Sequence, residues 1–95
     1  MQMQHVDIFV SSHETPSEGD YAASLGETAE HLVPVAGSSG VWDCWAIPVG
    51  PLTDLPGLET VLVEGLEDDS THVRLKVRAA ELGKRIRLRI YVLSQ

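Results

Sequence analysis

The sequence contains a single cysteine, Cys44, and this scarcity excludes two classes of small protein. One thiol cannot form a disulfide within the chain, and it cannot supply the several cysteines of a zinc-binding module. Cys44 lies between two tryptophans in an apolar stretch, and no histidine near it in the sequence could activate it as a nucleophile. We therefore predict a buried, structural cysteine.

Long apolar runs are absent too, and so is an N-terminal targeting segment. No stretch approaches the ~18–20 apolar residues that a membrane-spanning helix needs, and the first residues lack the basic start and apolar centre of a secretory signal. We expect no membrane partner and a cytoplasmic or virion-associated protein. With 43% hydrophobic and 22% charged residues, the 95-residue chain has the composition of a globular protein, and its length fits one domain over residues 1–95.

Motifs that carry catalysis or bind cofactors are missing as well. Metal-binding spacing is not found among the four histidines, at positions 5, 13, 31 and 72. No phosphate-binding loop, dinucleotide fingerprint or nucleophile elbow occurs. We predict that the protein is not an enzyme and has no catalytic residues, no cofactor and no metal. One alternative stays open: the acidic run at residues 64–69 could supply some of the oxygens that Ca²⁺ requires.

Basic residues are absent from the first 70 positions, which hold thirteen of the fourteen acidic side chains. All seven Lys and Arg lie in the last quarter of the chain, which makes the two parts opposite in charge. Opposite charges on neighbouring strands contribute about 0.2–1 kcal/mol per pair, and like charges directly opposite destabilise. We expect the basic strands to be neutralised by acidic segments of the same chain or of a symmetric oligomer, with a foreign acidic partner as the alternative. The net charge of −7 argues against nucleic acid as the partner.

Residues 73–92, VRLKVRAAELGKRIRLRIYV, have the clearest pattern of secondary structure. In both halves of this stretch, aliphatic residues alternate with Arg, Lys or Tyr, and such a period of two is typical of a strand with one buried face. The connecting AELGK contains Gly83, which suits a turn position with positive φ. We predict a C-terminal β-hairpin with one apolar and one cationic face.

Other segments with strand character are His5–Ser12, His31–Val35 and Leu58–Leu66. Pro34 places the second of these at the edge or the end of a sheet, because proline has no amide donor. Residues 21–32 fit either one helical face or two short strands around a turn at Gly26, and we prefer the strands. The segment Val41–Val49 is apolar on both faces, which predicts a central strand at the hub of the core.

Turn-forming residues separate these segments at intervals of about 8–12 residues. The spacing predicts an all-β fold: an antiparallel, immunoglobulin-like β-sandwich or a small barrel of six to seven strands. Part of the chain also resembles the end of a fibronectin type III or related immunoglobulin-like domain. In that family a Gly-Leu corner precedes a strand that has apolar residues at every second position up to an Ala. The residues that carry this resemblance are Leu62, Gly65, Leu66, Val73, Leu75, Val77 and Ala79.

The resemblance covers residues 61–95 and departs from the family pattern in two places. His72 and Val73 stand where the family usually has a tyrosine, and the expected early tryptophan is absent, since Trp42 and Trp45 lie elsewhere. What the resemblance implies is an architecture and a binding or structural module, because a fold alone does not decide function.

Our leading prediction for function is a non-catalytic structural or protein–protein interaction module. It would be a homo-oligomer and a small accessory subunit of a larger assembly, such as a bacteriophage head or tail component. The predicted interaction residues are five cations, two tryptophan anchors and three acids: Arg74, Lys76, Arg78, Arg87, Arg89, Trp42, Trp45, Glu67, Asp68 and Asp69. The alternative is an acidic inhibitor or mimic whose negative N-terminal portion binds a basic site on a partner.

Overall fold

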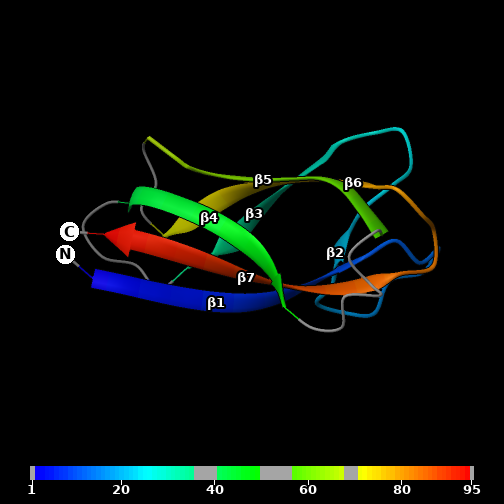
Figure 1. Ribbon diagram of the computed structural model, residues 1–95, viewed down its shortest axis with the longest axis horizontal. Helices are drawn as coiled ribbons and strands as arrows, with labels where there is room; N and C mark the ends of the chain where they lie inside the picture. Colours follow the sequence, from blue (N-terminus) through cyan, green and yellow to red (C-terminus); the bar gives the residue numbers. More distant parts are fainter. Residues whose placement is uncertain (1, 36–40, 50–56, 68–70, 95) are drawn as a thin grey trace.

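The protein is all-β in a computed structural model that describes residues 2–35, 41–49, 57–67 and 71–94 (Figure 1). Seven strands are present in the described residues: β1 (Gln2–Ser11), β2 (Tyr21–Ala22), β3 (Ala29–Pro34), β4 (Val41–Val49), β5 (Leu58–Gly65), β6 (His72–Ala79) and β7 (Arg85–Ser94). They form a four-stranded sheet in the order β2-β1-β7-β4 and a three-stranded sheet in the order β3-β6-β5. Within these same residues no helix has the length and apolar character that a membrane crossing requires.

The two basic strands are the central strands of the two sheets. β7 pairs antiparallel with β1 along its whole length and with β4 on its other side. β6 pairs antiparallel with β3 and with β5. Each basic strand therefore lies between two strands from the acidic part of the chain.

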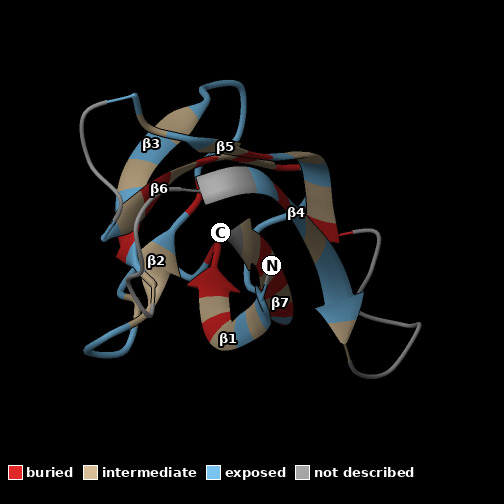
Figure 2. Ribbon diagram, turned by 90° about the vertical axis from the view of Figure 1, so that its left-hand side faces the viewer, coloured by how far each residue is buried: buried red, intermediate tan, exposed pale blue. Residues whose placement is uncertain are grey.

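One apolar core lies between the sheets, and the two basic strands supply most of it. Every second residue of β6 and β7 is buried, and Val73, Leu75, Leu88 and Ile90 are among those that are fully inaccessible. Residues of β1, β3, β4 and β5, together with Ala23, complete the same cluster, and buried segments occur in both sheets (Figure 2). In the described residues no strand ladder joins one sheet to the other, so the sheets do not close into a barrel.

The predicted C-terminal hairpin is wrong, because β6 and β7 are neighbours in sequence but belong to different sheets. The alternation in both strands was interpreted correctly, and Gly83 does take a positive φ of 75° in the connection. What was wrong is the pairing. In a hairpin the cationic rows of the two strands would face each other, whereas in separate sheets each row lies beside carboxylates.

The prediction that Val41–Val49 is the central hub is also wrong, since β4 is an edge strand of its sheet. Trp45 and Ile47 are 36% and 41% exposed, whereas Cys44 is buried, as predicted. Two features suit β4 to an edge. Pro48 offers no N–H to a further strand, and the register with β7 shifts between Val41 and Asp43.

The preference for strands over a helix in residues 21–32 is confirmed. β2 covers Tyr21–Ala22, Leu25 forms an isolated bridge to β6, and β3 begins at Ala29. Gly26 between them has a φ of 75°, which fits the predicted turn. Pro34 is the last residue of β3, an edge strand, as its missing donor predicts.

Candidate functional site

The outer face of the three-stranded sheet is covered by ion pairs between β6 and its two neighbours. Arg74 and Lys76 lie 3.2 Å and 3.3 Å from the same carboxylate oxygen of Glu64 on β5. Lys76 also reaches Glu30 on β3 at 3.7 Å. Hydrogen bonds from Lys76 and then Arg74 hold the pKa of Glu64 below its usual value. The cations of β6 are therefore bound within the chain.

A second group of ion pairs lies on the outer face of the four-stranded sheet, where β1 and β7 meet. Arg89 donates to both carboxylate oxygens of Asp7, at 2.8 Å and 3.2 Å, and Arg87 donates to the same carboxylate. These bonds lower the pKa of Asp7, the bond from Arg89 being the largest cause, and Asp7 in turn raises the pKa of Arg89. One carboxylate thus neutralises much of the charge of two neighbouring arginines.

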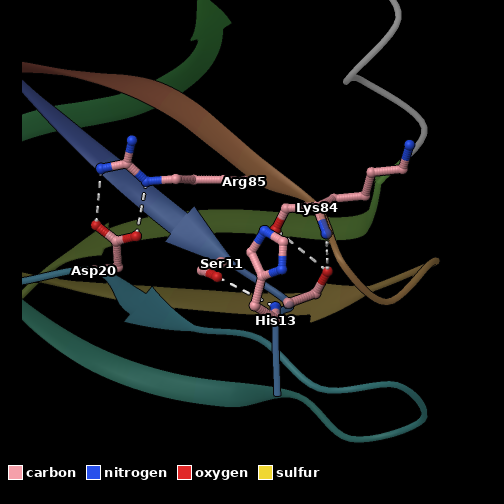
Figure 3. A network of polar contacts seen from close by, with 6 residues as sticks. Ser11, His13, Asp20, Lys84 and Arg85 are labelled. Carbon is pink, nitrogen blue, oxygen red and sulfur yellow. Dashed lines mark hydrogen bonds and ion pairs between the residues drawn. The ribbon is translucent and has the colours of Figure 1, made fainter. Parts of the chain in front are cut away.

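Farther along β7, Arg85 is held from two sides. It binds the carboxylate of Asp20 through two hydrogen bonds, of 2.8 Å and 3.2 Å (Figure 3). Its guanidinium carbon lies 3.7 Å from the centre of the Phe9 ring, in cation–π geometry. The side chain of Asp20 is almost completely buried by this contact, which anchors the loop before β2 to the sheet.

The remaining basic residues follow the same rule. Arg78 lies 3.2 Å from Glu59, and Lys84 lies 3.8 Å from Glu81. Every Lys and Arg of the chain therefore has a carboxylate of the same chain within ion-pair distance, and the expectation of internal neutralisation is confirmed. Whether the five predicted interaction cations also contact a partner stays a prediction.

An aromatic row crosses the outer face of the four-stranded sheet beside these ion pairs. The register aligns His5 of β1, Tyr91 of β7 and Trp45 of β4 directly across the three strands. Trp45 stacks on Tyr91 with 5.6 Å between ring centres and 20° between planes, and His5 lies 5.7 Å from Tyr91 on the other side. The three rings form one continuous, solvent-facing strip.

Exposed apolar side chains border this row. Met3 of β1 is 59% exposed and Ile47 of β4 is 41% exposed, each two residues along its strand from a ring of the row and therefore on the same face. We call His5, Tyr91, Trp45, Met3 and Ile47 together the aromatic face. It is the candidate functional site, because large apolar groups gathered on an exposed surface mark interaction sites.

The other predicted site residues contribute less to this picture. Trp42 lies in β4, but its side chain is outside the described residues, as are Asp68 and Asp69 entirely. Glu67 is exposed just after β5. In the part of the chain that the structure describes, no three His, Cys, Asp or Glu residues come together as metal ligands. Burial raises the pKa of the Cys44 thiol, which agrees with its predicted structural role.

A shallow cleft of about 500 Å³ lies at one end of the molecule, between the loop after β1 and the turn before β7. Ser12, His13, Glu14, Leu25 and Leu82 are among its lining residues. The Ser12 hydroxyl donates to the Glu81 carbonyl at 2.7 Å and accepts a hydrogen bond from the Lys84 amide at 3.0 Å. The His13 amide donates to the Ser11 hydroxyl (Figure 3). The Ser12 hydroxyl therefore ties the loop to the turn.

No family model matches the chain, and neither a curated protein nor a solved structure is significantly similar to it. The candidate site consequently rests on geometry. Of its members, sequence reasoning named Trp45 as an anchor, but it missed His5, Met3 and Ile47. Within β1 and within β4, Met3 and Ile47 lie two positions from a ring of the row, so the sequence places them on the same face of the strand as that ring. This placement becomes informative only when the register between the strands is known.

Proposed function

We propose that the protein is a non-catalytic interaction module that binds another protein through the aromatic face, as a small subunit of a larger assembly. The observation that carries this proposal is the stacking of Trp45 on Tyr91 at a position that leaves Trp45 36% exposed beside Met3 and Ile47. Tryptophan and tyrosine are enriched among the residues that dominate binding energy at protein interfaces. The two sheets would be the layers of an immunoglobulin-like sandwich that presents this face.

The surroundings of the aromatic face favour a protein partner over a nucleic acid. Strand-binding proteins combine stacking aromatics with cations that are free to bind phosphates. Here Arg87 and Arg89 are bound to Asp7, and the chain as a whole carries a net charge of −7. An apolar centre with a rim of hydrogen-bonded charges is the usual anatomy of a protein–protein interface.

A binding comparison of three forms of the protein tests the proposal. Immobilised wild type, Trp45→Ala and Leu62→Ala are exposed to an extract of the source cells, and the retained proteins are compared by mass spectrometry. Leu62 is the matched control, because it is 49% exposed but lies on the outer face of the other sheet. We expect a species retained by wild type and by Leu62→Ala but lost with Trp45→Ala. Equal retention by all three, with folding confirmed by circular dichroism, would reject the proposal.

The acidic inhibitor or mimic is a second candidate, favoured by the charge that remains after the ion pairs are made. Glu14, Glu18 and Glu27 are exposed, and no ion pair holds them among the described residues. We would then expect Glu→Gln changes at these three positions to abolish binding to a basic partner and Trp45→Ala to leave it intact. The same binding comparison, with this triple variant added, separates the two functions.

A further inference from the structure

The outer edge of β1 is a feature that the proposed function does not use. β7 pairs with one edge of β1 along its whole length, whereas β2 covers the opposite edge only at Val10 and Ser11. No segment of the described residues pairs with Gln2–Phe9 on that edge. An unpaired edge presents a row of free N–H and C=O groups, which can pair with a strand of another chain.

The edge strands of this protein differ in how they are protected. β3 ends in Pro34, and β4 contains Pro48 and a register shift. β5 has a register shift of its own, between Leu58 and Thr60. Proline and bulges are devices that stop an edge from recruiting further strands. Gln2–Phe9 contains no Pro, Gly, Lys or Arg, and its register with β7 is unbroken, so it lacks all of these devices.

We propose that two copies of the chain join edge to edge, with β1 pairing antiparallel to β1 of the second copy about a twofold axis at Val6. An antiparallel strand pairs with itself by twofold symmetry, so one copy satisfies the free edge of the other and the assembly closes as a dimer. The four-stranded sheets of the two copies then become one continuous sheet. This pairing goes beyond the proposed function, because it uses the strand edge together with the His5 and Met3 side chains, and it leaves Trp45, Tyr91 and Ile47 of the aromatic face uncovered.

The direction of the backbone groups supports this axis. The Ser11 carbonyl accepts a hydrogen bond of 2.9 Å from the Ala23 amide, so the backbone groups of Ser11 point to the β2 side. Because direction alternates along a strand, the backbone groups that point to the open edge belong to Phe9, Asp7, His5 and Met3. With the axis at Val6, His5 exchanges both backbone hydrogen bonds with Asp7 of the second copy, and Met3 comes to lie opposite Phe9.

Side chains that become neighbours in this register are complementary. The His5 ring has an N–H that can donate to the Asp7 carboxylate of the second copy. Arg87 and Arg89 make three hydrogen bonds to that carboxylate, and a carboxylate accepts about four. Met3 comes to lie beside the ring of Phe9, a favourable sulfur–aromatic contact. Both contacts occur twice because of the symmetry.

Other registers fit less well. An axis at His5 places His5 against His5 of the second copy and Met3 against Asp7, so the contact between His5 and Asp7 is lost. A register shift by one residue pairs the residues that face outward in one copy with residues that face the core in the other. An axis at Asp7 places Gln4 and Met3 opposite Val10 and Ser11, which β2 of the second copy already covers, whereas the axis at Val6 brings only Gln2 of the described residues opposite Val10.

Sedimentation equilibrium of wild type, His5→Pro and His5→Ala tests the pairing. The amide of His5 points to the open edge, so proline there removes a donor to the second copy without removing a bond to β7. We expect twice the chain mass for wild type, loss of the dimer for His5→Pro, and a retained though weaker dimer for His5→Ala, which keeps the amide. Trp45→Ala should stay dimeric, which separates this inference from the proposed function. A monomeric wild type, or a dimer that survives His5→Pro, overturns the pairing.

Cysteine cross-linking tests the register and does not depend on the folding of a proline variant. Directly opposite residues that do not hydrogen-bond have Cα atoms about 4.5 Å apart, a separation that a disulfide spans. Under mild oxidation Val6→Cys should form a covalent dimer and His5→Cys should not, with wild type as the control because its Cys44 is buried. Cross-linking of His5→Cys instead, or of neither variant, overturns the axis at Val6.

Discussion

Leu88→Ala measures how far the stability of the protein depends on β7. Leu88 is fully buried in the centre of the core, on the strand that joins β1 to β4. Truncating a fully buried leucine costs about 2–5 kcal/mol, because the transfer free energy of the removed atoms is lost and a cavity remains. A 95-residue domain has a free energy of unfolding of roughly 5–14 kcal/mol, so one such substitution removes a large share of it.

Ile47→Ala is the matched comparison, because it removes the same number of carbon atoms from the neighbouring strand. Ile47 is 41% exposed on the edge strand β4, and we expect a loss of about 1 kcal/mol or less. For a domain of this size each kcal/mol lowers the melting temperature by about 4–8 °C. A 3 kcal/mol loss in Leu88→Ala therefore corresponds to a shift of about 12–24 °C.

Urea unfolding followed by far-UV circular dichroism at one fixed protein concentration gives both values. Circular dichroism is preferred to tryptophan fluorescence because Trp45 lies two residues from Ile47 and would report the local change. The dependence on urea should stay the same in all three forms, so that a lower midpoint means a lower free energy of unfolding. If Ile47→Ala cost as much as Leu88→Ala, β4 and not β7 would be the hub of the core, and the assignment of edge and centre would be wrong.

Three further predictions follow from the ion pairs, the thiol and the turn. The pKa values of Asp7 and Glu64 are lowered in the folded state, so their contribution to stability is present above the unfolded pKa values of about 4 and is lost as the pH falls through the folded pKa values. The urea concentration at the unfolding midpoint should therefore decrease when the pH is lowered below about 4, and it should decrease less steeply in Asp7→Asn. The thiol of Cys44 should react with a disulfide reagent only slowly in buffer and rapidly in concentrated urea, and equal rates would show that it is accessible. Gly83→Ala should lower the free energy of unfolding by about 1 kcal/mol through backbone strain, since φ is 75° and nothing lies within 4 Å of the added carbon; an unchanged urea midpoint would contradict this.

Strand character could be predicted from the sequence wherever the residues alternate strictly. The alternation in β6 and β7 identifies which side chains are buried, and Pro34 identifies the end of an edge strand. These are local signals, because period and proline chemistry act within one strand. They carry no information about which strand lies beside which, so the position of β4 could not be derived from its composition.

The aromatic face shows the same limit. In the sequence, Trp45 lies 46 residues before Tyr91 and 40 residues after His5. Each sits on a strand whose outward face is predictable, yet their alignment into one row depends on the two registers of β7. A register shift of two residues would keep every side chain on its face and still separate the rings.

Charge could have replaced the missing pairing information for the basic strands. A hairpin of β6 and β7 would set Arg and Lys of one strand opposite Arg of the other, and directly opposite like charges destabilise a sheet. The sequence has carboxylates in four other strands, so the arrangement that sets carboxylates beside both cationic strands is one in which β6 and β7 are both central and never adjacent. A chain of seven strands allows that only if the two lie in different sheets or are separated by an acidic strand. The short connection at residues 80–84 cannot go around an intervening strand with ease, which leaves the crossing between sheets that the structure has.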